Sequence, residues 1–293
     1  MRIYAAILLL LLVILPIRSA TKRALLIGIS EYPENKTALD AGWPSIHGAN
    51  DVHILETTLK TQGFKVSTIL NRNASASNIR KALVKLQSET KLGDIIYLHF
   101  SCHGQPVEDK DGDEKDGWDE AIVPYDAWRK PIKGVYNGNK HILDDELNTV
   151  ISIIREKAGP TGFVYVVIDA CHSGGMDRGG EDDEDEVFLR GTDSGFSPSN
   201  KAYIPRMDTR SNIPISAVQG WADVCMLEAC RAYQSNHEIK ENGSFYGPLS
   251  FYICQTLQNC NLTSYTSWIQ TVKKMMDGNP KLANQNMVIQ ITK

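Results

Sequence analysis

The stretch that decides the fold runs from Val164 to Gly175, Val-Tyr-Val-Val-Ile-Asp-Ala-Cys-His-Ser-Gly-Gly. Its first half is apolar on both faces and rich in β-branched residues, which predicts a buried parallel strand. Parallel sheets keep their active sites just outside the carboxyl ends of their strands. Asp169 and Cys171 are therefore expected at such an edge, and Cys171 is a candidate nucleophile.

A second stretch, from Ile95 to Gly104, has the same shape, Ile-Ile-Tyr-Leu-His-Phe-Ser-Cys-His-Gly. If the two strands are neighbours, the thiol of Cys171 and the imidazole of His103 meet at one rim. An imidazole can generate the nucleophilic thiolate and later protonate a leaving amine. The backbone N–H groups of Gly104 and Cys171 are placed to stabilise an oxyanion. Taken singly, Cys171 is more typical of a buried thiol, and His103 of a turn residue.

The remaining sequence alternates apolar runs with helical periodicity and predicts an α/β fold. We expect a three-layer sandwich with a mostly parallel six-stranded sheet and helices on both faces. The long acidic stretch 104–141 is predicted to be a functional loop. Strands are expected at residues 23–30, 64–70, 94–101, 162–170, 222–230 and 286–292, and helices at 49–62, from 73 onward, 144–158, 244–257 and 264–276.

Two segments are expected to lie outside the folded core. Residues 1–20 combine Arg2 with a short apolar run, which is typical of a secretory signal peptide and too short for a membrane helix. We therefore expect a secreted or periplasmic protein without stable membrane insertion after signal removal. Residues 179–214 begin acidic and show no periodicity, which predicts a flexible linker.

Charge and cysteine usage exclude other classes. The net charge of −4 gives no basic surface for nucleic acid. The six cysteines contain no CxxC pair, so a structural zinc site is not expected. They are interpreted as buried thiols, with a Cys254–Cys260 bridge as the alternative. No histidine pair has ligand spacing, which disfavours a metal-dependent hydrolase.

The two strand ends together closely resemble the metacaspase branch of the caspase-like cysteine peptidases. That family carries a Ser-Gly-His-Gly segment, similar to Ser101–Gly104, and an Asp-Xaa-Cys-His-Ser-Gly segment, similar to Asp169–Gly174. Cys102 stands where the family usually has glycine. Residues 22–292 are covered, because similar segments also lie at 116–126, 142–145, 227–234 and 243–249. The resemblance implies a large-subunit-like portion at 21–178 and a small-subunit-like portion of the same fold at 215–293.

The resemblance also implies the roles of the site residues. Cys171 would be the nucleophile, His103 the general acid and base, and the Gly104 and Cys171 amides the oxyanion hole. Substrates would be peptides and proteins with Arg or Lys at P1, the residue before the cleaved bond. The P1 pocket would be formed by Asp51, Asp169 and Ser101, since buried carboxylates require a cation. Considered alone, Asp51 is more typical of a helix N-cap, and the alternative for Asp169 is capping of the following turn.

Many metacaspases use calcium, and the resemblance places its ligands at Asp119, Asp144, Asp145 and, with the register shifted by one residue, Asp177. The run 109–114 has part of the spacing of a calcium-binding loop. However, Glu114 occupies the position that such a loop reserves for glycine. We therefore interpret the run as a solvated acidic loop.

The predicted function is that of a monomeric cysteine endopeptidase, stimulated by calcium and cutting itself in the linker. Arg190-Gly191 and Lys201 are the candidate sites of self-cleavage. A clostripain-, gingipain- or legumain-like peptidase with another P1 preference is the alternative within the same fold. A catalytically inactive scaffold that binds partners is the alternative outside the enzymes.

Overall fold

The computed structural model describes residues 20–33, 41–171, 187–205, 207–262 and 265–292. The expected signal peptide, except Ala20, lies outside the described residues, and so does Asp177. No helix within the described ranges is long and apolar enough to cross a membrane. All six cysteines are free thiols, so the Cys254–Cys260 bridge is not formed.

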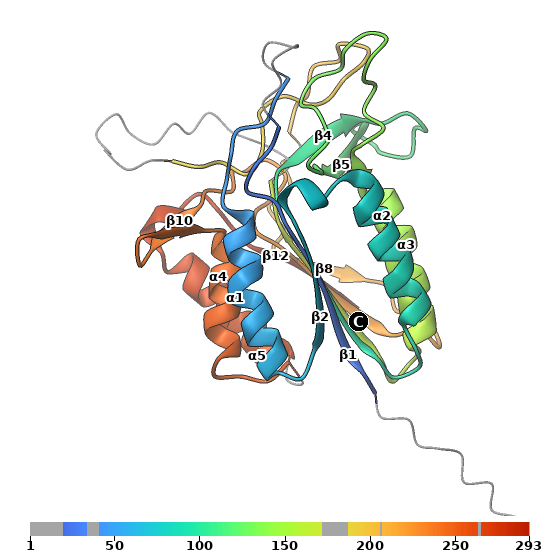
Figure 1. The fold of residues 1–293 in the computed structure, drawn as a ribbon, viewed down its shortest axis with the longest axis vertical. Coiled ribbons are helices and arrows are strands. Elements are labelled where there is room, and N and C mark those ends of the chain that lie inside the picture. Colours follow the sequence, from blue (N-terminus) through green and yellow to red (C-terminus); the bar gives the residue numbers. More distant parts are fainter. Residues whose placement is uncertain (1–19, 34–40, 172–186, 206, 263–264, 293) are drawn as a thin grey trace, which may run out of the picture.

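A seven-stranded sheet forms the centre of the molecule, in the order β2-β1-β3-β7-β9-β12-β8 (Figure 1). All neighbouring strands are parallel except β9 and β12, which are antiparallel. The strands are β1 (Lys22–Gly28), β2 (Lys65–Leu70), β3 (Ile95–Ser101), β7 (Phe163–Asp169), β8 (Asn212–Ile215), β9 (Asp223–Glu228) and β12 (Val288–Thr292). This confirms the α/β sandwich. The seventh strand, which the six-stranded expectation lacked, is β8 at the edge.

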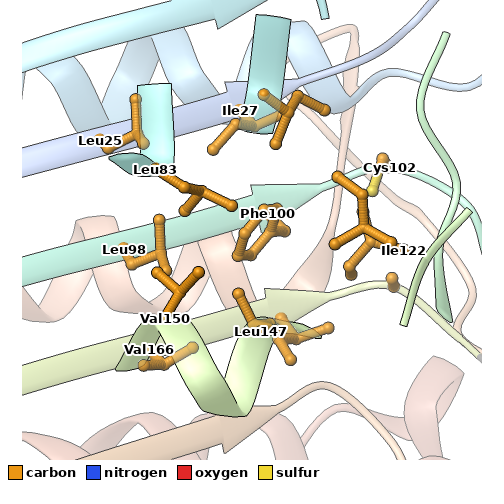
Figure 2. Packing of buried hydrophobic residues seen from close by; sticks show 14 of the residues in the cluster. Leu25, Ile27, Leu83, Leu98, Phe100, Cys102, Ile122, Leu147, Val150 and Val166 are labelled. Atoms are coloured by element: carbon orange, nitrogen blue, oxygen red, sulfur yellow. The ribbon is translucent and has the colours of Figure 1, made fainter. Parts of the chain in front are cut away.

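Helices cover both faces of the sheet (Figure 1). The helices of one face are α1 (Gly48–Thr61), α4 (Pro248–Leu257) and α5 (Tyr265–Asp277), and those of the other are α2 (Ala76–Glu89) and α3 (Asp144–Ala158). Each apolar strand contributes side chains to the hydrophobic cores on both faces of the sheet, because successive side chains point to opposite faces. In β3, Leu98 and Phe100 lie between Leu83 and Val150, as Figure 2 shows, while Tyr97 joins the opposite core.

The stretch expected as a long acidic loop folds into a small antiparallel sheet of β4 (Gly104–Glu108), β5 (Trp118–Ile122) and β6 (Ile142–Leu143). A hairpin of β10 (Ile239–Glu241) and β11 (Ser244–Tyr246) follows in the C-terminal portion. Short 3-10 turns lie at Asn71–Asn73 and Pro280–Leu282. Because β4 begins at Gly104, this small sheet holds the residues that follow the end of β3.

The segment expected as a flexible linker is partly packed into the molecule. Arg190 and Phe196 have no exposed surface. The N–H of Phe196 donates to the carbonyl of Pro106 at 2.7 Å, and Phe196 forms a parallel bridge with Val107 in β4. The described part of this segment therefore lies against the carboxyl end of the central sheet.

Candidate active site

Strand register brings the two predicted catalytic residues to one rim. Strands β3 and β7 are direct neighbours, and Ser101 pairs with Asp169. His103 and Cys171 each follow that pair by two residues, so they leave the sheet side by side. Cys102, between Ser101 and His103, points into the apolar core beside Ile122 (Figure 2). Burial raises the pKa of the Cys102 thiol to about 12, so it remains protonated and inert.

His103 is held as a neutral base. Its ring stacks on Trp43 at 4.7 Å between centroids and lies 5.0 Å from the ring of Tyr32. Nε2 lies 2.9 Å from the carbonyl oxygen of Pro44, which can only accept, so the ring proton is assigned to Nε2. Nδ1 is buried without a hydrogen-bond partner. Burial lowers the pKa of His103 to about 4, which leaves Nδ1 free to take a proton at neutral pH.

Cys171 is fully buried in this state. Its thiol donates to the backbone carbonyl of Gln234, with 2.8 Å between sulfur and oxygen. Since Nε2 of His103 contacts Pro44 and Nδ1 has no partner, the thiol and the imidazole are not hydrogen-bonded to each other. The predicted nucleophile is therefore engaged by Gln234 and not by the predicted base.

The predicted oxyanion hole is occupied by the chain itself. The N–H groups of Gly104 and Cys171 both donate to the carbonyl oxygen of Arg190, each at 3.1 Å. The next residue, Gly191, lies directly on the nucleophile: a Cβ built there would overlap the carbonyl oxygen of Cys171 and lie 2.9 Å from its Cβ. The Arg190–Gly191 peptide bond thus occupies the position of a bond to be cut.

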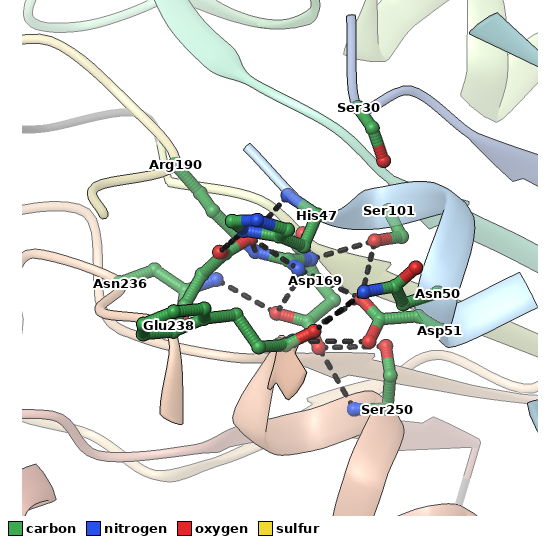
Figure 3. A network of polar contacts seen from close by, with 12 residues as sticks. Ser30, His47, Asn50, Asp51, Ser101, Asp169, Arg190, Asn236, Glu238 and Ser250 are labelled. Atoms are coloured by element: carbon green, nitrogen blue, oxygen red, sulfur yellow. Dashed lines mark hydrogen bonds and ion pairs between the residues drawn. The ribbon is translucent and has the colours of Figure 1, made fainter. Parts of the chain in front are cut away.

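The side chain of Arg190 fills a pocket made of the three predicted P1 residues and one more (Figure 3). Nη2 lies 2.8 Å from Asp51 Oδ2, and Nη1 donates to Ser101 Oγ at 2.6 Å. Nη1 also donates to the backbone carbonyl of Asp169 at 3.1 Å and lies 3.6 Å from its carboxylate. Glu238 Oε1 accepts from Nε at 3.1 Å and from Nη2 at 2.8 Å. All four charged side chains are fully buried.

A second layer of contacts fixes the pocket acids. Asp51 accepts from the N–H of Gly247 at 3.0 Å, so it does not act as an N-cap within its own helix α1. Asp169 Oδ2 accepts the N–H and hydroxyl of Ser250 at 2.8 and 2.7 Å, and Oδ1 accepts from the Asn236 amide at 2.8 Å. These donors come from the C-terminal portion, so the pocket is built jointly by both halves of the fold.

Glu238 is a pocket residue that the sequence did not reveal. Its Oε1 accepts from the N–H of His47 at 2.8 Å, and its Oε2 lies 2.6 Å from His47 Nδ1 (Figure 3). A single glutamate in the run Asn236-His237-Glu238-Ile239 has no spacing that marks it. The only available signal is a charge directly before the apolar Ile239, which is 2% exposed.

Three carboxylates around one guanidinium leave an excess of negative charge. Burial raises the pKa of Asp51 to about 7; Arg190 opposes this shift, and Asp169 and Glu238 add to it. Burial disfavours the charge on Arg190, but Asp51, Asp169 and Glu238 outweigh it and raise the pKa of the guanidinium. The pocket is therefore electrostatically suited to a cation of this shape.

The residues around Arg190 are bound as an added strand. The N–H of Arg190 donates to the carbonyl of Asn236 at 3.0 Å, and the N–H of Glu238 donates to the carbonyl of Phe188 at 3.0 Å. Leu189 forms an antiparallel bridge with His237. Pairing of an extended peptide with an exposed backbone edge is a common mode of peptide recognition.

The predicted calcium residues separate into two places. Carboxylate oxygens of Asp109, Asp113 and Asp119 lie within 4.8 Å of one another, and those of Asp111, Asp113 and Asp145 form a second such group. Asp119 is 4% exposed, and its Oδ1 is buried without a hydrogen-bond partner. Burial and the nearby carboxylates raise its pKa to about 6. These hard oxygens fit a calcium ion.

Asp144 belongs to neither carboxylate group among the described residues. It lines a different pocket with Glu120 and Glu228, and burial together with the charges of Glu120, Asp145 and Asp119 raises its pKa to about 7. The carboxylates grouped with Asp119 and Asp145 come instead from the 109–114 run, which was interpreted as a solvated loop.

Comparison with known proteins gives a consistent assignment. The caspase domain family matches residues 21–292. Metacaspase-1 of Schizosaccharomyces pombe is 25% identical over 286 residues, which cover 87% of this chain and 64% of the relative. Metacaspase-7 of Arabidopsis thaliana is 34% identical over 165 residues, 53% of this chain and 35% of the relative.

The chain thus spans about half the length of the curated relatives it matches. Among solved structures, a protein of Geobacter sulfurreducens superposes with a TM-score of 0.60 at 19% identity and covers 93% of each chain. Similarity at this level of identity shows a shared fold.

Proposed function

The chain belongs to the caspase domain family, and on that basis we propose that it is a cysteine endopeptidase of metacaspase type that cleaves peptide bonds after arginine or lysine. The observation that carries the proposal is the seating of Arg190. Its guanidinium lies among three buried carboxylates while its carbonyl oxygen accepts from both N–H groups of the oxyanion hole. Peptides and proteins with a basic P1 residue are the substrates that this arrangement fits.

The residues support a two-step acyl transfer. His103 Nδ1 takes the thiol proton of Cys171, and the thiolate attacks the P1 carbonyl carbon. Gly104 and Cys171 N–H groups stabilise the resulting oxyanion. His103 then protonates the leaving amine as the C–N bond breaks, and water hydrolyses the thioester with His103 as the base. Each step moves one proton through Nδ1, the ring nitrogen that the structure leaves free.

We propose that the enzyme cuts its own chain between Arg190 and Gly191. Of the two candidate sites, only Arg190 lies in the P1 pocket. The Nζ of Lys201 donates to the carbonyl of Gly117 at 2.9 Å and lies 5.2 Å from the ring centroid of Trp118. Mass spectrometry of the wild-type chain and a Cys171→Ala variant, with and without calcium, tests this. We expect fragments ending at Arg190 in the wild type alone; intact chains in both would refute self-cleavage.

Peptide assays test the P1 preference. We expect hydrolysis of fluorogenic peptides ending in Arg or Lys, and none of peptides ending in Asn or Asp, because the pocket acids repel or fail to pair with those side chains. Covalent labelling by an arginyl chloromethylketone should be lost in Cys171→Ala. Cleavage after Asn would instead favour a legumain-like enzyme, and the absence of both labelling and cleavage would favour an inactive scaffold.

We propose further that calcium binds the acidic loop and supports activity. Asp109, Asp113 and Asp119 would hold the ion, with Asp111 and Asp145 beside them. When bound, calcium would supply positive charge that relieves repulsion among these carboxylates. Isothermal titration of the Cys171→Ala chain with calcium measures binding independently of activity, and the absence of a binding heat would contradict it.

We also propose export of a monomeric enzyme, supported by the apolar N-terminal sequence of residues 1–20. N-terminal sequencing of the mature protein from its source tests the export, and an intact Met1 would contradict removal of a signal. Sedimentation of the purified chain tests the monomer.

A further inference from the structure

The segment in the active site also presents Phe188, two residues before Arg190, to two aromatic rings. The His47 ring meets Phe188 edge-on, with 4.6 Å between centroids and 88° between planes. The Phe245 ring in β11 lies 4.8 Å from Phe188 at 67°. His47 and Phe245 are themselves stacked at 5.0 Å. Edge-on contacts at these distances are the favourable geometry for aromatic pairs.

Backbone pairing determines which residue of a substrate reaches these rings. Phe188, Leu189 and Arg190 lie along residues 236–238 as an antiparallel strand. Side chains alternate along such a strand, so the residues at P1 and P3 point to the same side. The P3 residue is the second one before P1. A substrate bound through the same backbone contacts would therefore place its P3 side chain where Phe188 lies.

The two rings are held in place independently of Phe188. Nδ1 of His47 lies 2.6 Å from Glu238 Oε2, and this glutamate also binds the P1 guanidinium. The carbonyl of Phe245 accepts from the Asn50 amide at 3.1 Å, and the Lys240 ammonium lies 5.2 Å from the centroid of its ring. A preformed site requires little ordering when a ligand binds.

We propose that His47 and Phe245 form a subsite for an aromatic side chain at P3. The preferred substrates are then peptides with an aromatic residue, any residue, and arginine before the cleaved bond. This specificity rests on the proposed function, and it adds a second recognition element to the P1 pocket. His47 joins the two, because it contacts the P3 ring and holds the glutamate of the P1 pocket.

Three fluorogenic peptides test the subsite on the full chain in calcium-containing buffer: Ac-Phe-Leu-Arg-, Ac-Leu-Phe-Arg- and Ac-Ala-Leu-Arg-aminomethylcoumarin. The first two have the same composition and differ only in the position of phenylalanine. We expect kcat/KM for Ac-Phe-Leu-Arg to exceed that of the other two by about tenfold. Equal values would overturn the subsite while leaving the P1 proposal intact. Cleavage of none of the three would overturn the proposed function and the subsite together.

A pair of variants in one strand localises the effect. Phe245→Leu removes the ring that faces the substrate, and Tyr246→Leu removes the neighbouring ring, which packs on Phe251 at 5.4 Å. We expect Phe245→Leu to reduce the preference for Phe at P3 to about twofold, and Tyr246→Leu to retain it. An unchanged preference in a folded Phe245→Leu protein would overturn the assignment. If that variant does not fold, the wild-type comparison of the three peptides still decides.

Discussion

The position of Gly191 allows a sharp test of whether the seated segment is a reactive one. Gly191 follows the carbonyl held in the oxyanion hole, and its backbone does not have a positive φ. Alanine therefore introduces no backbone strain at this position. Its methyl group, however, would overlap the carbonyl oxygen of Cys171 and lie 2.9 Å from the Cβ of that residue. The Gly191→Ala substitution thus acts sterically on the bond to be cut.

The size of the effect follows from the displacement required. Carbon atoms in contact prefer about 3.5–4.0 Å, so the new methyl group must move about 1 Å away from the nucleophile. Backbone atoms of Cys171 cannot yield, because its N–H also forms the oxyanion hole. A misplacement of about 1 Å at a reacting centre costs about a hundredfold in rate. We therefore expect self-cleavage after Arg190 to slow by about a hundredfold.

The assay is a time course of intact mass for Gly191→Ala and the wild type after calcium addition. Ser194→Ala is the matched control, since Ser194 is the fourth residue after the bond and its hydroxyl pairs with that of Thr192. Hydrolysis of Ac-Phe-Leu-Arg-aminomethylcoumarin should be delayed in Gly191→Ala in step with self-cleavage, because the uncut segment keeps Arg190 in the P1 pocket. Self-cleavage of Gly191→Ala at the wild-type rate and at the same bond would refute the idea that the seated peptide is in reactive register.

The pocket and the acidic loop lead to three further predictions. Glu238→Gln should lower kcat/KM for Arg peptides about a hundredfold, a loss of about 3 kcal/mol in transition-state binding. The loss should be smaller for Lys peptides, because only a guanidinium can donate to Glu238 from both Nε and Nη2. An unchanged ratio of kcat/KM between Arg and Lys peptides would contradict this. Burial raises the pKa of Asp51 to about 7 although Arg190 lowers it, so Asp51 in a pocket without Arg190 takes up a proton at pH 7 or above, and kcat/KM for Arg peptides should fall as the pH is lowered to 7 and below. The pKa of His103, lowered to about 4, leaves it neutral over this range, and the acid limb should disappear in Asp51→Asn. Calcium at a hundredfold excess over Kd should raise the Tm of the Cys171→Ala chain by about 5 °C, as measured by scanning calorimetry. The same rise is expected when Asp144→Asn is added to that chain, and no rise is expected when Asp119→Asn is added.

The parts of the site that sequence could predict are those fixed by strand ends. Two apolar runs of similar length that end in His103 and Cys171 predict two buried strands, and the family resemblance adds that their ends meet. In the structure the pairing of Ser101 with Asp169 places both residues at one rim. The register follows from local pattern and chain connectivity, which a single sequence contains.

Glu238 and the packed linker illustrate what a single sequence does not contain. Apolar periodicity predicts the burial of side chains only where the hydrophobic effect causes that burial. The burial of Arg190 is instead stabilised by ion pairs with three carboxylates from distant parts of the chain. The residues next to it in the sequence show no apolar periodicity. A solvated linker was the reasonable prediction for that composition, and only the tertiary partners change it.

The acidic residues at the start of α3 show that spacing in the sequence does not predict which carboxylates come together. Asp144 and Asp145 are adjacent at the start of α3, so their side chains diverge by about 100° around the helix axis. One joins the carboxylates of the 109–119 region and the other faces Glu228. The choice depends on how α3 docks on β5, which is a tertiary contact.

Self-cleavage would require the Cys171 side chain to move, because its thiol is not hydrogen-bonded to the imidazole of His103 in this structure. The Cys171 thiol must leave the carbonyl of Gln234 and reach Nδ1 of His103 before the proton can move. Everything else for the reaction is in place, since the carbonyl of Arg190 already lies in the oxyanion hole. If the segment is cut as proposed, the contacts that hold it as a substrate would also make it an inhibitor until the thiol moves. A tethered segment of this kind acts at an effective concentration of about millimolar, so free peptides compete poorly until it is cut or displaced.

Strand β4 connects that change to the acidic loop. It begins at Gly104, which follows His103 and donates to the oxyanion hole, and its Val107 pairs with Asp119 in β5. Val107 also bridges to Phe196 on the leaving-group side of the seated segment. A cation on Asp119 would therefore act on the strand that carries both the catalytic donor and the downstream anchor. Because coupling between two binding equilibria is reciprocal, a cation that weakens the seating of the segment through β4 must itself bind more tightly once the segment has been released.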